Sequence, residues 1–329
     1  MKEASASRFV CPACGGPLRL TAARKNEGRV EEGAFDCPPC GRTYPIRRFI
    51  PRFAGELSGT DQHTAGSFGF KWAMFSKIDA YYKKNFLDEL APLDLGTFFI
   101  GKSVLDAGTG VGIPAYCMAE LGAREVFAFD IMSAIEDTYR NNLDHPQVTV
   151  AQADIYAAPF KQASFDAVVC VGVLQHLPDY RRAVDSLLSF VKPGGHLILW
   201  VYASEGNGFV RWVVEPLRKS FTRRLPVKVC YGLSWVIGVL FHVVAVGIYG
   251  PLNRVGFRRL PMNDYIRYRA RFNLPINVQM VFDQLLAPLS HLYSRAKIEA
   301  LMDRPELEDK IFRHHNRNSW TVIARRRPG

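Results

Sequence analysis

The sequence has few cysteines and lacks the regular cysteine spacing of a disulfide-stabilised domain. Three of the seven stand alone, at Cys117, Cys170 and Cys230, and the other four form two close pairs. This usage is typical of a reducing compartment, where thiols bind metals, and it disfavours a secreted disulfide scaffold. The first residues lead into no apolar run, so we expect no secretory signal and a cytoplasmic protein.

Acidic residues are scarce in the C-terminal part of the chain. Residues 1–202 hold 21 Lys/Arg against 22 Asp/Glu, whereas residues 203–329 hold 21 against nine. The net charge of +11 therefore belongs to the C-terminal part, in clusters such as residues 258–259 and 325–327. Such an excess is either a solvated basic face or a surface for an anionic partner, namely lipid headgroups, phosphates or nucleic acid.

Two Cys-x-x-Cys pairs at the front of the chain predict a metal site in residues 1–55. They are followed by Gly15 and Gly41, which permit a tight turn, and the cysteines are Cys11, Cys14, Cys37 and Cys40. Four thiolates close a tetrahedral shell, which suits structural Zn²⁺, with iron as the minor alternative. Residues 26–28 (Asn-Glu-Gly) predict a hairpin tip between the pairs. Metal binding would supply most of the folding free energy of so small a segment.

The cysteine pairs and the following "YPIRRFIPRF" resemble the small zinc-ribbon proteins that activate tRNA, rRNA and protein methyltransferases. The resemblance covers about residues 8–54. It implies that this segment supports an attached catalytic domain and performs no chemistry itself.

A glycine-rich turn follows the first buried strand of the next segment, "GKSVLDAGTGVGIPAYCMAEL" (101–121). Glycines at 108, 110 and 112 let the backbone approach a ligand closely. Dinucleotide-binding enzymes use similar turns, so the glycines alone decide little. Asp106 favours another ligand, because a carboxylate at the strand end would repel a pyrophosphate and attract an ammonium group.

Further acidic residues end the next two strands that we expect. "EVFAFD" ends in Asp130, which is placed to accept hydrogen bonds from ribose hydroxyls, and "VTVAQAD" ends in Asp154, which is placed to meet the adenine amine. A fourth strand in "FDAVVCVGVLQHLPD" (165–179) and a fifth at 191–202 complete an alternation of strand and helix. The pattern predicts an α/β fold with a doubly wound, mostly parallel, Rossmann-like sheet.

These residues, together with "LQHLPD" (174–179), resemble the class I S-adenosylmethionine (SAM) methyltransferases of the type 11 domain, over about residues 100–202. The alternative is a Rossmann-like domain that binds NAD or no ligand. The resemblance implies that Asp130 holds the ribose of SAM, Asp154 with Ile155 the adenine, and the glycine turn the methionine end. The full set of cofactor-binding residues that it implies is Asp106, Gly108, Gly110, Gly112, Asp130, Ile131, Asp154, Ile155 and Val171.

His176 is our candidate general base, because it follows the fourth strand where the methyl group is expected. A histidine suits proton transfer from a hydroxyl acceptor at neutral pH, although such a residue can equally only shape the pocket. Gln175 beside it is a candidate acceptor contact. The chain has no Asn-Pro-Pro-Tyr-like tetrapeptide after this strand, which argues against an adenine or glutamine amine as acceptor.

Two further segments are expected to cover the site. Residues 56–99 resemble lid helices of related enzymes, in which Trp72, Tyr81 and Tyr82 would line the lid, unless they are ordinary packing aromatics. Residues 204–290 form a long insertion before the last helix (294–303) and two strands (310–317 and 319–327), which belong to a terminal segment, 291–329, completing the core domain of residues 100–203.

The insertion contains "YGLSWVIGVLFHVVAVGIYG" (231–250), within 25 uncharged residues that lie between Lys228 and Arg254. The length suits a membrane span, but a single crossing would separate the last strands from their sheet. We therefore expect two short buried helices or a segment at the membrane interface.

The sequence thus predicts a SAM-dependent methyltransferase with structural zinc that acts on a hydrophobic or lipid-linked small molecule, by O- or C-methylation. An apolar lid over SAM and peripheral contact with an anionic inner-membrane surface would suit that acceptor. The alternative is an RNA methyltransferase that binds nucleic acid through the ribbon and the basic C-terminal part. The sequence leaves the oligomeric state open.

Overall fold

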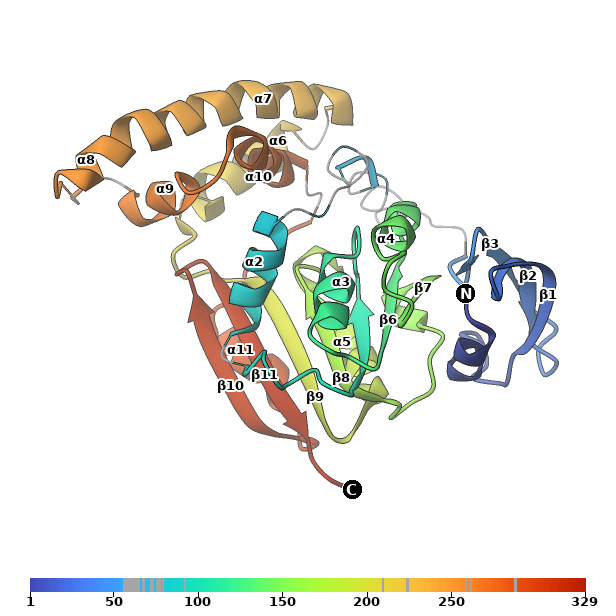
Figure 1. The fold of residues 1–329 in the computed structure, drawn as a ribbon. Coiled ribbons are helices and arrows are strands. Elements are labelled where there is room, and N and C mark those ends of the chain that lie inside the picture. Colours follow the sequence, from blue (N-terminus) through green and yellow to red (C-terminus); the bar gives the residue numbers. More distant parts are fainter. Residues whose placement is uncertain are drawn as a thin grey trace. The chain divides into compact units, whose positions relative to one another are not determined.

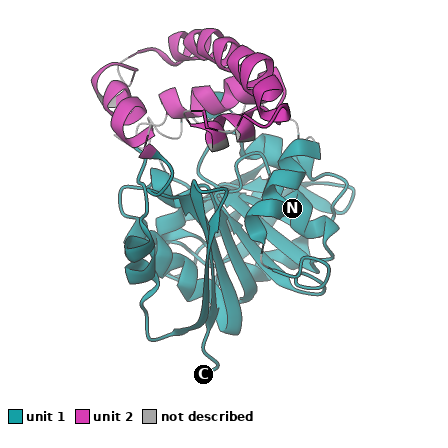
Figure 2. Ribbon diagram, turned by 90° about the vertical axis from the view of Figure 1, so that its left-hand side faces the viewer, with its two compact units in different colours: residues 1–207, 289–329 teal, residues 208–288 magenta. Residues whose placement is uncertain are grey.

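The structure, a computed structural model, describes residues 1–329 except 56–65, 67, 68, 72, 73, 75–77, 79, 92, 209, 223, 224, 258, 261, 287 and 288. The described chain forms two compact units. Unit 1 comprises residues 1–207 and 289–329, and unit 2 comprises residues 208–288 (Figure 2).

The N-terminal ribbon of unit 1 is a four-stranded antiparallel sheet in the order β1-β2-β3-β4. Its elements are η1 (Glu3–Arg8), β1 (Arg19–Asn26), β2 (Arg29–Asp36), β3 (Thr43–Arg47) and β4 (Ile50–Pro51). Glu27 (φ 48°) and Gly28 (φ 70°) form the two-residue tip between β1 and β2, as the sequence predicted. Positive φ at both positions matches the twist of the flanking strands.

The catalytic part of unit 1 is a seven-stranded sheet in the order β10-β11-β9-β8-β5-β6-β7 (Figure 1). The five central strands pair in parallel, and β11 and β10 continue the sheet antiparallel from β9. The strands are β5 (Ser103–Ala107), β6 (Glu125–Asp130), β7 (Val148–Gln152), β8 (Phe165–Val171), β9 (Val191–Tyr202), β10 (Leu307–His315) and β11 (Ser319–Arg326). This is the predicted Rossmann-like sheet.

Helices cover both faces of the sheet, because its central strands are apolar on both sides. One core cluster joins α2 and α3 to one face, and a second joins α5, α11 and the ribbon to the other. The helices and short turns of this part are α2 (Ala80–Leu90), α3 (Ile113–Glu120), α4 (Ile135–Asn141), η2 (Ile155–Ala157), η3 (Leu174–His176), α5 (Tyr180–Phe190) and α11 (Arg295–Met302). Asp179 and Ser294 cap α5 and α11 through side-chain oxygens.

Unit 2 is helical. Its elements are η4 (Val210–Val214), α6 (Glu215–Ser220), α7 (Val227–Val243), η6 (Val244–Tyr249), α8 (Gly250–Arg254), α9 (Asn263–Arg269) and α10 (Leu274–Leu286). α7 packs against α10 in antiparallel fashion, since Tyr231 contacts Phe282 and Gly238 contacts Val278.

The prediction of two short buried helices in the apolar stretch is wrong. α7, η6 and α8 form one helical run, Val227–Arg254, and only 22% of its most apolar window is buried. Among the described residues it is the one helix that length and composition would allow to cross a membrane. The prediction failed because it equated an apolar composition with burial.

Candidate active site and metal centre

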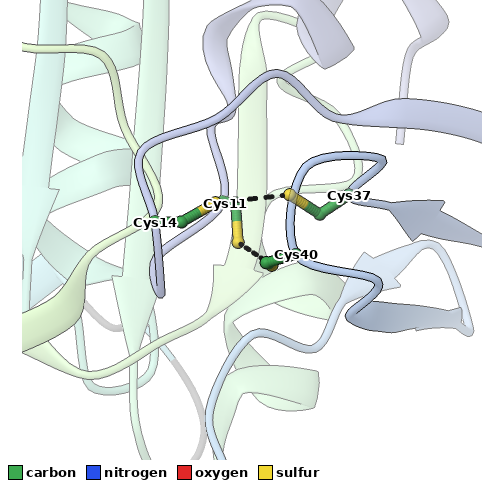
Figure 3. Close-up of side chains that lie close together, drawn as sticks. All are labelled: Cys11, Cys14, Cys37 and Cys40. Atoms are coloured by element: carbon green, nitrogen blue, oxygen red, sulfur yellow. Dashed lines mark hydrogen bonds between the residues drawn. The ribbon is translucent and has the colours of Figure 1, made fainter.

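The four cysteines of the two Cys-x-x-Cys pairs come together in the ribbon (Figure 3). Their sulfur atoms all lie within 4.8 Å of one another, with 3.5 Å between those of Cys14 and Cys37 and 3.6 Å between those of Cys11 and Cys40. Thiolates about 2.3 Å from one Zn²⁺ would stand about 3.8 Å apart in a tetrahedron. The donor set and its spacing therefore fit structural zinc.

Two similar turns present these thiols. Gly15 N–H donates to the Cys11 carbonyl and Gly41 N–H to the Cys37 carbonyl, each at 2.8 Å, with φ near 70° at both glycines. That left-handed conformation favours glycine, which explains the residue after each pair. The Tyr44 hydroxyl lies 3.2 Å from Cys11 Sγ, where it can donate to the thiolate.

The ribbon shares a hydrophobic core with the catalytic sheet. The ring of Phe9 lies 5.4 Å from that of Phe160 and 5.8 Å from that of Phe127, measured between centroids. Arg8 pairs with Glu125, at the start of β6, and donates to the Ser164 carbonyl. Since these aromatics are buried, loss of the ribbon would expose an apolar face of the catalytic part.

A hydrogen-bonded chain links the last ribbon strand to the loop after β6. Arg52 Nη1 donates to Gln152 Oε1 (3.1 Å), and Gln152 Nε2 donates to the Ile131 carbonyl (3.0 Å). Phe53 N–H also donates to the Gln152 carbonyl at 2.7 Å. Ile131 was predicted to bind the cofactor, so the ribbon supports a candidate cofactor residue through two hydrogen bonds. Such a link depends on tertiary pairing, and no local sequence signal reveals it.

The glycine turn lies at the carboxyl end of β5, between this strand and α3. All three glycines have positive φ, with 90° at Gly112, the residue before α3. A Cβ at Gly112 would stand 2.5 Å from Asn142 Nδ2, and one at Gly108 would stand 2.3 Å from Val173 Cγ2. Only glycine fits these two positions, so the turn is held tightly against its neighbours.

Helix α4 braces the same turn, which sequence reasoning missed. Thr138 Oγ1 donates to the Gly110 carbonyl (2.7 Å), and Asn141 Nδ2 donates to the Val111 carbonyl (2.9 Å). The signal lies in the amides and hydroxyl on one face of "IEDTYRNN", but it points to the turn only once the fold is known.

Asp106 and Asp130 bring two carboxyl groups to this end of the sheet, and both are buried. Asp130 accepts hydrogen bonds from Gly110 N–H and Met132 N–H, each at 3.0 Å. Neither oxygen of Asp106 has a hydrogen-bond partner within the described part of the chain. Burial raises the pKa of Asp106 to about 7 and that of Asp130 to about 6.

Two buried carboxyls without a cationic partner among the described residues suit a positively charged ligand. SAM carries an ammonium and a sulfonium group, and its ribose hydroxyls can donate to Asp130, whose oxygens each retain a lone pair. The residues present therefore fit SAM.

The other predicted cofactor residues follow the neighbouring strands. Asp154 caps the turn η2 through a 2.9 Å hydrogen bond from Tyr156 N–H, and Ile155 is buried in that turn. Val171 ends β8. Because the carboxyl ends of the parallel strands β8, β5, β6 and β7 meet at one edge, the structure brings the whole predicted set to the same edge of the sheet.

His176 and Gln175 lie in the turn η3, just after β8. His176 Nδ1 stands 2.8 Å from the Leu289 carbonyl oxygen. The Gln175 side chain is fully buried, and neither its oxygen nor its nitrogen has a hydrogen-bond partner within the described residues. A buried amide without partners is costly, which marks it as a candidate ligand contact.

Two aromatic residues at the end of β9 join this group and were not predicted. The ring of Tyr202 lies 6.0 Å from His176 and 5.4 Å from Trp200. Trp200 and Tyr202 are half-buried, while Leu199 and Val201 between and before them are buried. The alternation in "LWVY" was the available signal, because it places both aromatics on the same side of the strand.

The predicted lid is described only in part. Trp72 lies outside the described residues, and Tyr81 and Tyr82 lie on α2 with ring centroids 5.6 Å apart. Tyr82 packs against the core cluster of α2 and α3. A lid role for these three residues stays a prediction.

Comparison with known families gives two matches within the chain. Residues 105–199 match a model described as a methyltransferase domain, and residues 9–48 match the Trm112p-like proteins. The first covers the sheet from β5 to β9, and the second covers the cysteine ribbon.

Curated relatives are similar to the catalytic part. A ubiquinone biosynthesis O-methyltransferase of Paraburkholderia phymatum is 35% identical over 189 residues, which are 51% of this chain and 79% of the relative. The enzyme of the same name from Alkalilimnicola ehrlichii is 39% identical over 101 residues, 30% of this chain and 40% of the relative. The chain thus spans between two fifths and four fifths of these two relatives.

Solved structures show weaker likeness. The N-methyltransferase NodS of Bradyrhizobium japonicum WM9 is 13% identical, with a TM-score of 0.46, and the match covers 80% of this chain and 98% of NodS. A complex of the Haloferax volcanii Trm112 activator with a methyltransferase is 18% identical, with a TM-score of 0.35, over 45% of this chain and 62% of that one.

The family matches agree with the geometry of the site. The matched domain carries the glycine turn, Asp106 and Asp130, and the relative from P. phymatum is covered over more than two thirds of its length. The chain belongs to the class I SAM-dependent methyltransferases and carries a Trm112-like ribbon at its N-terminal end.

Proposed function

We propose that this enzyme transfers the methyl group of SAM to a hydroxyl oxygen of a hydrophobic, lipid-linked acceptor. The hydrogen bond between His176 Nδ1 and the Leu289 carbonyl carries the proposal. A carbonyl oxygen only accepts, so Nδ1 bears the proton, and in the neutral ring Nε2 then carries the lone pair. That tautomer is the one a general base needs to take the proton of a hydroxyl group.

The remaining residues hold the two reactants. When bound, SAM supplies a methyl group that its sulfonium charge already activates. Asp130 with Ile131 holds the ribose, Asp154 with Ile155 the adenine, and Asp106 with the glycine turn the methionine end, beside Val171. Positioning by these rigid strand ends supplies much of the rate enhancement in such a transfer.

An aromatic acceptor suits the surroundings of His176. Trp200 and Tyr202 offer partly exposed ring faces, and the buried Gln175 amide can orient a hydroxyl or carbonyl group. The relatives' name places O-methylation in ubiquinone biosynthesis, which supports oxygen over carbon as the acceptor atom. Neither the relatives nor the ribbon match favours the RNA alternative.

Two segments complete the proposal. Residues 56–99 act as a lid over SAM, and residues 204–290 supply the apolar cover of the acceptor; residues 100–203 and 291–329 make up the core domain. A lipid-linked acceptor also supports a cytoplasmic enzyme that works at the inner membrane surface.

His176 is tested by two substitutions. His176→Asn keeps a donor to Leu289 but lacks the basic nitrogen, and His176→Ala lacks both. We expect each variant to lose roughly 10²-fold or more in kcat while the Kd for SAM holds. His314→Ala, an exposed histidine on β10, is the matched control. A near-normal rate for His176→Asn would reduce His176 to a pocket residue.

The acceptor class is tested by following methyl transfer from isotope-labelled SAM. A dihydroxybenzene with a farnesyl tail should be methylated at one oxygen, with a much lower KM than the same ring without a tail. Methylation of bulk tRNA or rRNA with no transfer to either ring compound would overturn the proposal.

A further inference from the structure

Unit 2 carries most of the exposed apolar side chains of the protein. Among the described residues, 16 of the 20 exposed large hydrophobic side chains belong to residues 208–288. They include Trp212 (73% exposed), Leu240 (64%) and Val236 (60%). Apolar exposure concentrated in one unit to this extent is typical of a surface that another apolar medium or molecule covers.

Helix α7 buries small residues on one side and exposes many of its large apolar residues on the other. Cys230, Ser234 and Gly238 recur every four residues and are buried. A Cβ at Gly238 would stand 2.9 Å from the backbone of Val278 on α10, so the two helices approach closely. Small residues at a close helix contact, with large apolar residues on the other side, are typical of helices in lipid.

The interior of unit 2 contains a polar cluster within an otherwise apolar core. Arg269 is 1% exposed, and its guanidinium donates to the Asn277 side chain (2.7 Å) and carbonyl (2.8 Å). Asn277 Nδ2 lies 3.0 Å from His242 Nδ1 on the inner side of α7. The inner side of α7 thus meets a buried polar cluster as well as apolar side chains, while valine and leucine side chains on its other side are exposed, which departs from the usual polar outer face of a surface helix.

Unit 2 is rich in basic residues outside its apolar run. Residues 208–288 hold 12 Lys/Arg and three Asp/Glu, although the run from 229 to 253 holds neither. Lys228 and Arg254, which bracket the run, are exposed. This distribution complements an anionic bilayer, with apolar side chains below the headgroups and cations at their level.

A small pocket lies at the C-terminal end of the apolar run. It has a volume of about 300 Å³ and is lined by Tyr249, Gly250, Asn253, Arg254, Arg267 and Ala270. Asn253 Nδ2 is held by the Tyr249 carbonyl and Asn263, whereas Asn253 Oδ1 is buried without a partner among the described residues. Two guanidinium groups at an apolar helix end suit the phosphate of a lipid headgroup.

The dimensions of unit 2 favour a position along the membrane surface over a crossing. The run Val227–Arg254 has 28 residues, or about 42 Å, but α10, which packs antiparallel to it, has 13 residues, or about 20 Å. A return helix of that length is too short for a hydrocarbon core of about 30 Å. Both ends of unit 2 also join unit 1 at one place, since Ala203 bridges Tyr293.

We propose that unit 2 docks on an anionic lipid bilayer. The outer face of α7, defined by Val229, Val236, Leu240 and Val243, enters the acyl boundary, and Arg254 with Arg267 binds a lipid phosphate. A second copy of the chain is a poor occupant, because it would bring a unit of the same high positive charge to this face. The docking does not depend on the acceptor proposed above.

Vesicle co-sedimentation of the full chain tests the docking. We expect binding to vesicles of phosphatidylcholine with phosphatidylglycerol, and binding at least tenfold weaker to phosphatidylcholine alone. Val236→Glu with Leu240→Glu should weaken binding to the anionic vesicles at least tenfold. The control Ile100→Glu, at a 61% exposed site in unit 1, should leave it unchanged.

The pocket is tested with the same vesicles. Arg254→Ala with Arg267→Ala should weaken binding roughly tenfold, whereas Arg19→Ala with Arg313→Ala removes equal charge from unit 1 and should change it little. Retained SAM binding shows that each variant is folded. An equal loss in both double variants, with inorganic phosphate bound in solution, would overturn the lipid pocket.

Two results would overturn the docking itself. One is a wild-type protein that stays in the supernatant with every vesicle. The other is a dimer in sedimentation velocity that Val236→Glu with Leu240→Glu converts to monomer, which would assign the outer face of α7 to a second copy.

Discussion

Unit 1 and unit 2 differ in how many apolar side chains they expose. In unit 1 the aromatic rings of Phe9, Phe127 and Phe160 are buried between ribbon and sheet. In unit 2 the outer face of α7 is apolar and exposed, while Arg269 and Asn277 lie inside. Mutations of the same type should therefore act differently in the two units.

Metal removal should have the largest effect, and it should be confined to unit 1. Chelation of Zn²⁺, or Cys37→Ser, removes the metal–thiolate bonds that supply most of the ribbon's folding free energy. We expect hydrogen exchange of β1–β4 to approach that of an unfolded chain, while α7 and α10 keep their protection. Cys117→Ser, a buried cysteine outside the cluster, is the control. Unchanged exchange after verified metal loss would contradict a structural metal.

Truncation of an apolar side chain should have the second-largest effect, and this effect should differ between the two units. Phe160→Ala empties a buried site in unit 1 and should lower the free energy of unfolding by about 3–5 kcal/mol. Leu240→Ala removes an exposed side chain of unit 2 and should change it by no more than about 0.5 kcal/mol. Urea unfolding measures both. Equal losses would mean that the outer face of α7 is covered within the protein in solution.

The buried carboxyls of unit 1 predict a pH dependence with a definite sign. Asp106, Asp130 and Glu89 have pKa values raised by burial to about 7, 6 and 8, above those of an unfolded chain. The native state then binds more protons, so its stability without SAM is highest below about pH 4 for these groups and falls as pH rises toward 8.

SAM should reverse part of this trend, because a cationic ligand favours the ionised carboxylates. We expect its affinity, measured by calorimetry, to rise several-fold from pH 5.5 to 7.5, with proton release on binding. Asp106→Asn should bind SAM weakly and with less pH dependence. A pH-independent affinity in the wild type would exclude a direct role for the two aspartates.

The smallest effect should come from the link between ribbon and cofactor loop. Arg52→Ala removes the hydrogen bond to Gln152 and should weaken SAM binding about fivefold, since Gln152 then holds Ile131 less firmly. Arg48→Ala is a matched control, because Arg48 shares the Glu136 partner but is 74% exposed and has no hydrogen bond to Gln152. If both variants weakened SAM binding equally, the loss of the contact with Glu136 would explain the change instead.

The catalytic sheet could be predicted because its signals are local. The second strand (125–130) and the fifth (191–202) have the predicted bounds, and the glycine turn marks the end of the first. The second strand ends in Asp130, and glycines follow the first, so local residues mark where these strands end. The positions of the candidate site residues followed from topology, since parallel strands end at one edge.

The rest required information that is not local. The Arg52–Gln152 link joins residues 100 positions apart, and the place of Tyr202 beside His176 depends on how β9 pairs with β8. For α7 the sequence did hold a signal, the four-residue spacing of Cys230, Ser234 and Gly238. This spacing was overlooked because a helix that is apolar on every side does not show from its composition which face is buried.

The bridge between Ala203 and Tyr293 has a consequence for how the protein could be engineered. Ser204 N–H also donates to the Tyr293 carbonyl, so the chain leaves and re-enters the sheet within a few ångströms of the same point. A segment joined in this way can be replaced without moving the strands on either side of it. A short turn in place of residues 208–288 would leave every strand pairing of the sheet available, and it would yield a catalytic core whose SAM chemistry can be studied apart from lipid.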